Sequence, residues 1–192
     1  VTDRVSYLDE GDWVVLSQGD ASVRNAAGDI VEPEIKITAL TGALVGKGNH
    51  RHYMLKEIYE QPTVIGETLN TFFNPASRTI QLPDLPFDLS AVSKVTIVAC
   101  GTSFLAGQVA RYWFERVAGI NVEIDIASEF RYRGASMPDG GLAIFISQSG
   151  ETADTLAALR YARDQGNHTL AVVNVAESTM AREADALLQT HA

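Results

Sequence analysis

From residue 94 onward, short apolar segments alternate with longer amphipathic ones, and this alternation limits the possible folds more than any other feature. The apolar segments have the length of buried strands and lie at residues 94–99, 122–127, 142–146, 170–175 and 186–189. The segments between them show helical spacing and lie at residues 103–118, 152–165 and 179–184. Strands that alternate with helices form a parallel sheet with helices on both faces. The sequence therefore predicts a three-layer α/β fold here.

Two of the expected helices carry apolar faces. These faces consist of Leu105, Val109, Tyr112 and Trp113 in the first helix and of Leu156, Leu159 and Ala162 in the second. Gly166 follows the second helix as a C-terminal cap. Trp113, like Trp13 near the start of the chain, is expected to lie in the core because large aromatic side chains are mostly buried.

The first 40 residues have a different pattern. Short extended runs lie at residues 5–8, 13–16, 22–24 and 34–37, with turn-rich clusters at 9–12 and 25–29. This pattern predicts a β-meander of four or five strands. A chain of about 40 residues is near the lower limit for independent folding, so we expect the meander to be part of a larger domain.

The middle of the chain begins with a glycine-rich stretch, residues 41–49, which has little periodicity and is interpreted as a linker. A helix is expected over residues 52–59. Pro62 suits the first turn of a second helix, which should end near Asn74 and Pro75.

Composition excludes several classes of function. The net charge of −9, from 15 basic and 24 acidic residues, disfavours nucleic acid as the main partner. The longest apolar runs have five or six residues, whereas a membrane-spanning helix needs about 20, so we expect no membrane segment. Cys100 is the single cysteine, which excludes an internal disulfide and a multi-cysteine metal site. No secretion leader is visible, and the cytoplasm is the expected compartment.

Two loops rich in hydroxyl groups follow the strands at 94–99 and 142–146. They are Cys100-Gly101-Thr102-Ser103 and Ser147-Gln148-Ser149-Gly150-Glu151-Thr152. In a parallel sheet both loops lie at the carboxyl edge, where ligands bind. Each leads into a helix, whose first N–H groups attract anions. The sequence therefore predicts a site for a phosphate or a polyhydroxy ligand.

Other interpretations of these loops are weaker. A single serine or threonine would more often be a helix cap than a ligand contact, but several hydroxyls in two loops at one edge favour a site. Neither loop has the glycine and lysine pattern of a nucleotide-binding motif. A nucleophilic role for Cys100 would require an activating group, and none is visible in the sequence. Glu151 is expected to point away from an anion as a first-turn carboxylate.

The second loop resembles the Ser-x-Ser-Gly-x-Thr loop of sugar isomerase (SIS) domains, which are parallel α/β sandwiches that bind phosphosugars. Longer stretches are similar to the glutamine–fructose-6-phosphate aminotransferase (isomerising) family of amino-sugar biosynthesis, and they lie at residues 51–62, 99–103, 111–115, 127–133 and 147–156. The resemblance covers essentially the whole chain.

This resemblance implies three parts. Residues 1–40 would be the last strands of an N-terminal-nucleophile glutaminase domain, residues 41–52 a linker, and residues 53–192 the first SIS half with its leading helices. It also implies that fructose 6-phosphate, or the product glucosamine 6-phosphate, is bound by Thr102, Ser103, Ser147, Gln148, Ser149 and Thr152. The second loop would hold the phosphate.

The family's catalytic groups have no counterpart in this sequence. The glutaminase nucleophile is an N-terminal cysteine, where this chain has Val1, and the isomerase residues belong to a second SIS half. We therefore expect no catalytic residue, metal or cofactor here, and no turnover by this chain alone. Glutamine would be bound only by the glutaminase part, and a homodimer is expected. A phosphosugar sensor and an SIS deaminase or deglycase are alternatives, which the acidic β-meander at the start disfavours.

Overall fold

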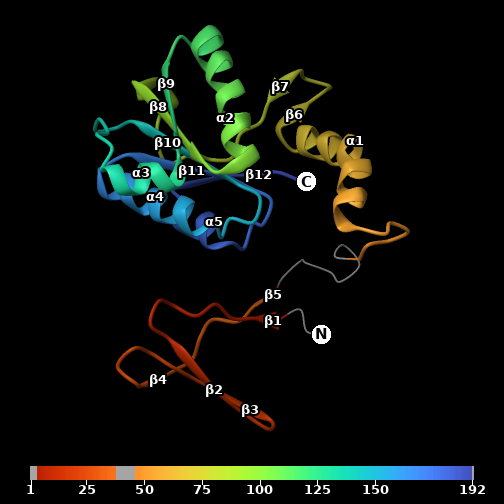
Figure 1. The fold of residues 1–192 in the computed structure, drawn as a ribbon, viewed down its shortest axis with the longest axis vertical. Coiled ribbons are helices and arrows are strands. Elements are labelled where there is room, and N and C mark those ends of the chain that lie inside the picture. The colour runs from red at the N-terminus through yellow and green to blue at the C-terminus, as the bar shows by residue number, and fades with distance from the viewer. Residues whose placement is uncertain (1–3, 38–45, 192) are drawn as a thin grey trace. The chain divides into compact units, whose positions relative to one another are not determined.

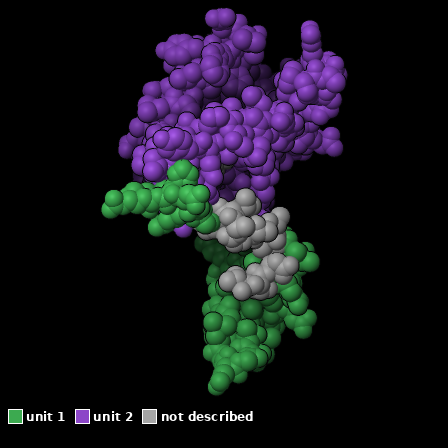
Figure 2. Space-filling view, turned by 90° about the vertical axis from the view of Figure 1, so that its right-hand side faces the viewer, with its two compact units in different colours: residues 1–52 green, residues 53–192 purple. Residues whose placement is uncertain are grey.

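The computed structural model describes residues 4–37 and 46–191. The chain divides into two compact units, Val1–His52 and Tyr53–Ala192, which are coloured separately in Figure 2. Among the described residues, no helix is long and apolar enough to cross a membrane.

The second unit is built on a five-stranded parallel sheet with the order β12-β11-β10-β8-β9 (Figure 1). Its strands are β8 Lys94–Ala99, β9 Asn121–Ile126, β10 Leu142–Ser147, β11 His168–Val173 and β12 Ala186–Gln189. The sequence places β8 and β12 correctly and the other strands within two residues. Near-continuous apolar runs are typical of strands that are covered on both faces.

Helices cover both faces of this sheet. They are α2 Gly101–Trp113, continued by one π-helical turn at Phe114–Ala118, then α3 Ala127–Arg133, α4 Ala153–Asp164 and α5 Thr179–Glu183. Helices α3, α4 and α5 pack on one face around Phe130 and Phe145, and α2 packs on the other around Ile97 (Figure 1). The three-layer α/β prediction is confirmed. Helix α3 was not anticipated because seven residues with only two buried positions show almost no periodicity.

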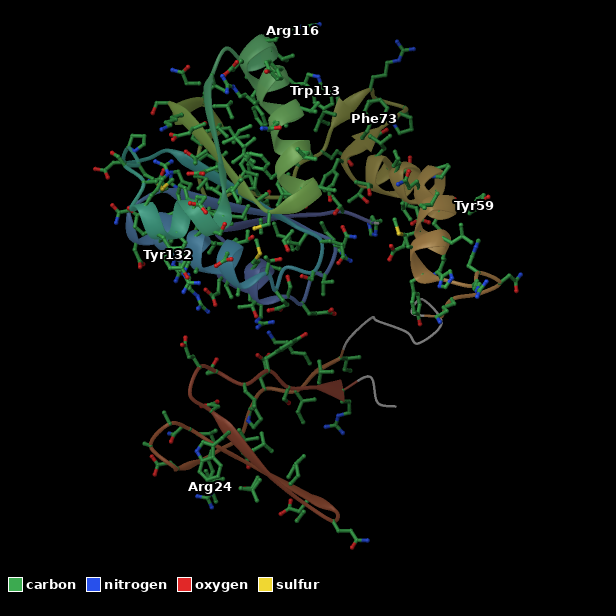
Figure 3. The ribbon with its side chains drawn as sticks, in the orientation of Figure 1. Arg24, Tyr59, Phe73, Trp113, Arg116 and Tyr132 are labelled. Atoms are coloured by element: carbon green, nitrogen blue, oxygen red, sulfur yellow. The ribbon has the colours of Figure 1, made fainter. Side chains whose placement is uncertain are left out.

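The face of α2 predicted to be buried lies in solvent instead. Leu105, Val109, Tyr112 and Trp113 are all at least half exposed, with Trp113 at 64%. Figure 3 labels Trp113 on this helix. The helix packs on the sheet through small residues: a Cβ on Gly107 would lie 2.9 Å from Cγ2 of Ile97. The prediction was wrong because close packing through glycine and alanine leaves no large-residue pattern in the sequence.

Residues 53–72 form one helix, α1 Tyr53–Phe72, and the predicted break before Pro62 is absent. A proline inside a helix deprives the carbonyl group four residues earlier of its N–H donor. That carbonyl belongs to Ile58, which is 51% exposed, so water can replace the lost donor. A short antiparallel ladder, β6 Phe73–Asn74 with β7 Thr79–Ile80, and a 3₁₀ turn at Leu89–Ala91 lead into β8.

The first unit contains a three-stranded antiparallel meander and a separate two-stranded ladder. The meander consists of β2 Trp13–Ser17, β3 Asp20–Arg24 and β4 Ile30–Val31, and β1 Arg4–Val5 pairs with β5 Lys36–Ile37. No described residue of this unit is buried. Trp13 is 47% exposed with the Arg24 guanidinium 5.7 Å from its ring centroid, so the expectation of a core tryptophan was wrong. Of the predicted linker, residues 41–45 lie outside the described residues.

Candidate functional site

The two hydroxyl-rich loops meet at the point where the strand order reverses. From β8 the chain continues to β9 on one side and then returns to β10 on the other side of β8. The loops that follow β8 and β10 therefore flank the same crevice at the carboxyl edge of the sheet. In open α/β sheets this position is the usual ligand site.

A cavity of about 290 Å³ lies between these loops. Its lining residues come from the cap and first turn of α2, the end of β10, the loop after β10 and the start of α4. They are Cys100, Ser103, Ile146, Ser147, Gln148, Ser149, Thr152 and Thr155. The structure thus brings together five of the six sequence-predicted residues. The sixth, Thr102, is exposed in the first turn of α2 and does not line the cavity.

Three lining residues were missed by the sequence prediction. Thr155 lies one helical turn after Thr152 and is fully buried, and its hydroxyl donates to the Cys100 sulfur at 3.9 Å. Its spacing of three from Thr152 on α4 was the available signal. Cys100 lies between β8 and α2 as the N-cap residue of α2, and Ile146 is apolar and carried no signal.

Hydrogen bonds within the second loop fix its shape. The Ser147 hydroxyl, on a residue only 5% exposed, accepts the Gly150 N–H at 3.1 Å and lies 3.0 Å from the Thr152 hydroxyl. The Ser149 hydroxyl accepts the Glu151 N–H at 3.2 Å. A hydroxyl donates one bond and accepts two, so one hydrogen of the Ser147–Thr152 pair stays available for a ligand.

The loop is also attached to the segment after β11. The Asn174 N–H donates to the Gln148 carbonyl and the Met180 N–H to the Gly150 carbonyl, each at 3.1 Å. The Glu151 carboxylate does not line the cavity, and its Oε1 accepts the Thr179 N–H at 2.7 Å. These contacts lie on the side of the loop that faces away from the crevice, and they hold the loop in place.

The cavity lining is polar but carries no carboxylate, lysine, arginine or histidine among the described residues. Helix α4 starts at its edge, with Thr152 as the N-cap residue in an extended conformation. The first N–H groups of a helix have no partners within the helix and favour an anion. Asp154 in the first turn is paired with Arg131 at 3.2 Å, which offsets its charge.

Two further features bear on the chemistry of the site. Cys100 is half-buried and its described side-chain partner is the Thr155 hydroxyl, which does not activate a thiol as a nucleophile. Within residues 4–37 and 46–191, no group of three or more histidine, cysteine or carboxylate side chains is placed to hold a metal ion. The arrangement suits recognition of a ligand that carries several hydroxyl groups and one anionic group.

Comparison with known proteins gives consistent results. The model of the SIS domain family matches residues 88–192. The chain is 56% identical over its full length to glutamine–fructose-6-phosphate aminotransferase [isomerizing] of Zymomonas mobilis and 54% identical over 98% of its length to that of Bradyrhizobium diazoefficiens. It covers 32% and 31% of those proteins. The chain therefore spans about a third of the length of the curated relatives it matches.

Solved structures show the same fold. The C-terminal domain of glucosamine-fructose-6-phosphate aminotransferase from Francisella tularensis has a TM-score of 0.65 and 38% identity, over 76% of this chain and 41% of that one. Glucosamine-6-phosphate deaminase from Thermotoga maritima has a TM-score of 0.58 and 25% identity, over 72% of this chain and 40% of that one. The sequence resemblance is confirmed, and the aminotransferase is favoured over the alternatives.

Proposed function

The chain belongs to the SIS domain family, and from this premise we propose that its cavity at the β8–β10 crevice binds fructose 6-phosphate. The observation that carries the proposal is the convergence of two hydroxyl-bearing loops on one uncharged cavity at the start of α4. Such a lining offers hydrogen bonds to sugar hydroxyls and unpaired helix N–H groups to a phosphate.

We assign the residues of the two loops different roles. Ser147, Gln148, Ser149 and Thr152 hold the phosphate, because they surround the start of α4 and one hydroxyl hydrogen of the Ser147–Thr152 pair is unused within the loop. Ser103 and Thr102, in the first turn of α2, contact the sugar. Thr102 can do so only from the rim of the cavity, since it does not line it.

The whole protein, we propose, transfers the amide nitrogen of glutamine to fructose 6-phosphate and yields glucosamine 6-phosphate and glutamate. Ammonia released from glutamine attacks the sugar's carbonyl carbon with loss of water, and a proton then moves between neighbouring carbons. Such a proton transfer requires a positioned acid or base. The described lining of this cavity contains no histidine, lysine or carboxylate, so this chain binds the sugar phosphate and has no turnover alone.

We also infer the compartment and the oligomeric state of the whole protein. The protein acts in the cytoplasm as a homodimer, with residues 1–40 as the end of a glutaminase domain that binds glutamine. The net charge of −9 opposes binding to nucleic acid or to an anionic membrane surface. Sedimentation equilibrium of the chain would test the dimer.

The test of the binding site is a titration of the chain with fructose 6-phosphate, followed by calorimetry and by amide chemical shifts. We expect the largest shifts at residues 147–153, weaker ones with inorganic phosphate, and none of comparable size with fructose. The double variant S149A/T152V should weaken binding at least about tenfold, as expected for the loss of hydrogen bonds to a charged group.

Ser136, an exposed serine in the loop before β10, supplies the matched control. Ser136→Ala should bind like the unmodified chain. Absence of fructose 6-phosphate binding by the unmodified chain, or equal affinity in the double variant, would contradict the proposed site.

A further inference from the structure

We propose that Glu151 is a positioning residue of the sugar-phosphate site, because its carboxylate fixes the Ser147–Thr152 loop to the start of α5. The inference rests on the proposed function of that loop and adds a residue that touches neither the cavity nor its ligand. The contact that carries it is the 2.7 Å hydrogen bond from the Thr179 N–H to Oε1 of Glu151.

A carboxylate in a phosphate-binding loop is unexpected on electrostatic grounds. Two negative charges near each other repel, so Glu151 by itself should weaken the binding of a phosphate. In the structure its Oε1 faces the α5 N–H group instead of the cavity. The Thr179 N–H donates a hydrogen bond to the ionised oxygen, and such bonds to charged groups are stronger than neutral ones. The carboxylate therefore accepts a hydrogen bond outside the cavity and does not face the ligand.

The carboxylate acts together with a close backbone contact at the preceding residue of the loop, Gly150. The Gly150 carbonyl accepts the Met180 N–H at 3.1 Å. A Cβ on Gly150 would lie 2.0 Å from Oγ of Ser178, which is 2% exposed. The loop thus lies directly on residues 178–180, and the Glu151 bond closes the contact at its exposed end.

This position has a consequence for the ligand-facing hydroxyls. Glu151 follows Gly150, whose N–H is bonded to the Ser147 hydroxyl, and its own N–H is bonded to the Ser149 hydroxyl. A shift of Glu151 would disturb both bonds, which fix the positions of the Ser147 and Ser149 hydroxyls. Loss of the Thr179 contact should therefore weaken sugar-phosphate binding through the shape of the loop.

Two substitutions break the contact from opposite sides. Glu151→Ala removes the acceptor, and Thr179→Pro removes the donor. Proline suits the site because Thr179 is the first helical residue after the cap residue Ser178, whose φ of −66° and ψ of 160° are favourable before proline. Glu151→Gln removes the charge and keeps an oxygen acceptor, and Thr179→Ala keeps the N–H and removes the side chain.

The first measurement is hydrogen exchange of the Gly150 amide, which needs no ligand. We expect exchange at least about tenfold faster in E151A and T179P, the order expected when a hydrogen bond to a charged group is lost. E151Q should lie between E151A and the unmodified chain because it keeps a neutral acceptor, and T179A should stay near the unmodified chain. In the double variant E151A/T179P the Gly150 amide should exchange no faster than in either single variant, because both substitutions remove the same contact.

The second measurement is the dissociation constant for fructose 6-phosphate in the same variants. If Glu151 positions the loop, E151A weakens binding and E151Q restores it in part. If the carboxylate only repels the phosphate, both variants bind more tightly. Glu129→Gln, which removes an exposed carboxylate from the first turn of α3, measures the effect of charge alone.

The two proposals can fail separately. Unchanged Gly150 exchange in E151A and T179P, or tighter binding in E151A, would overturn the positioning role even if the chain binds the sugar phosphate well. Faster exchange in both variants, together with no binding by the unmodified chain, would support the positioning of the loop and overturn the proposed ligand.

Discussion

The Ser147 hydroxyl lies 3.0 Å from the Thr152 hydroxyl and also accepts the Gly150 N–H, so one side chain joins both ends of the loop at the β8–β10 crevice. Ser147 is the last residue of β10, and Thr152 precedes α4. The bond therefore connects the end of a strand to the start of a helix across the candidate site.

Ser147→Ala should destabilise the chain and weaken its binding of fructose 6-phosphate. The substitution leaves the buried Gly150 N–H without its acceptor, which costs about 1–3 kcal/mol of unfolding free energy. Urea unfolding gives the stability and calorimetry gives the affinity. Ser149→Ala, at an exposed position, should reduce affinity with little loss of stability, and equal stability losses in both variants would contradict this account.

Gly150→Ala should be much more harmful than an alanine at another left-handed glycine. Gly150 has a φ of 66°, and an added Cβ would meet Ser178 at 2.0 Å. Gly134 has a φ of 61° with nothing within 4 Å, so Gly134→Ala measures backbone strain alone, about 1–2 kcal/mol. We expect G150A to lose a further 1–3 kcal/mol or so through overpacking and to lose sugar-phosphate binding, which G134A keeps.

Acid should weaken the contact between α4 and α5 through Glu183. Hydrogen bonds from Arg160, at 2.8 and 2.6 Å, lower the pKa of Glu183 below the ordinary value of 4.5, although partial burial acts in the opposite direction. A lowered pKa in the folded state stabilises the fold above the unfolded-state pKa, and this contribution is lost as the pH falls through the folded-state pKa.

Glu183→Gln should therefore be less stable than the unmodified chain at pH 7, and the difference should shrink as the pH falls below 4.5. The Arg160 side chain is 41% exposed, so solvent limits the effect to about 1 kcal/mol or less. Urea midpoints between neutral and acid pH provide the measurement, with Glu129→Gln as control. A difference that stays constant over this range would refute the assignment.

Both tryptophans should be accessible to solvent in the folded chain. Trp13 and Trp113 are 47% and 64% exposed. We expect acrylamide to quench their fluorescence in the native chain almost as strongly as in urea, and the emission to shift little on unfolding. Trp113→Phe and Trp13→Phe separate the two signals. A blue-shifted, poorly quenched Trp113 would show that something covers this face of α2.

The sequence was most informative for the strands of the parallel sheet, because burial on both faces alone determines their runs of apolar residues. Strands β8 and β10 are covered on both faces, so their apolar runs gave the parallel sheet almost to the residue. The sequence-based prediction failed for helices α1 and α2, because the spacing of apolar residues does not determine how these helices pack. Helix α2 approaches Ile97 through Gly107, and α1 passes through Pro62 because its surroundings are exposed.

The candidate site was largely predictable because its residues lie in two short loops directly after buried strands. Thr155 was missed because it lies inside α4 and resembles an ordinary helical residue. The role of Glu151 depends on Thr179, and only the folded chain brings these two residues together. Local sequence indicates which groups a loop presents, whereas the partners behind the loop come from tertiary structure.

The pairing of β8 with β10 also determines when the candidate site can form. Val95 lies beside Leu142 in the sheet, and α2, β9 and α3 lie between them in sequence. Contacts between residues so distant along the chain form slowly, because the entropy of closing the loop is lost before the contact stabilises anything. The crevice therefore does not exist until the centre of the sheet has assembled. Fructose 6-phosphate should slow the unfolding of this chain and leave its folding rate unchanged.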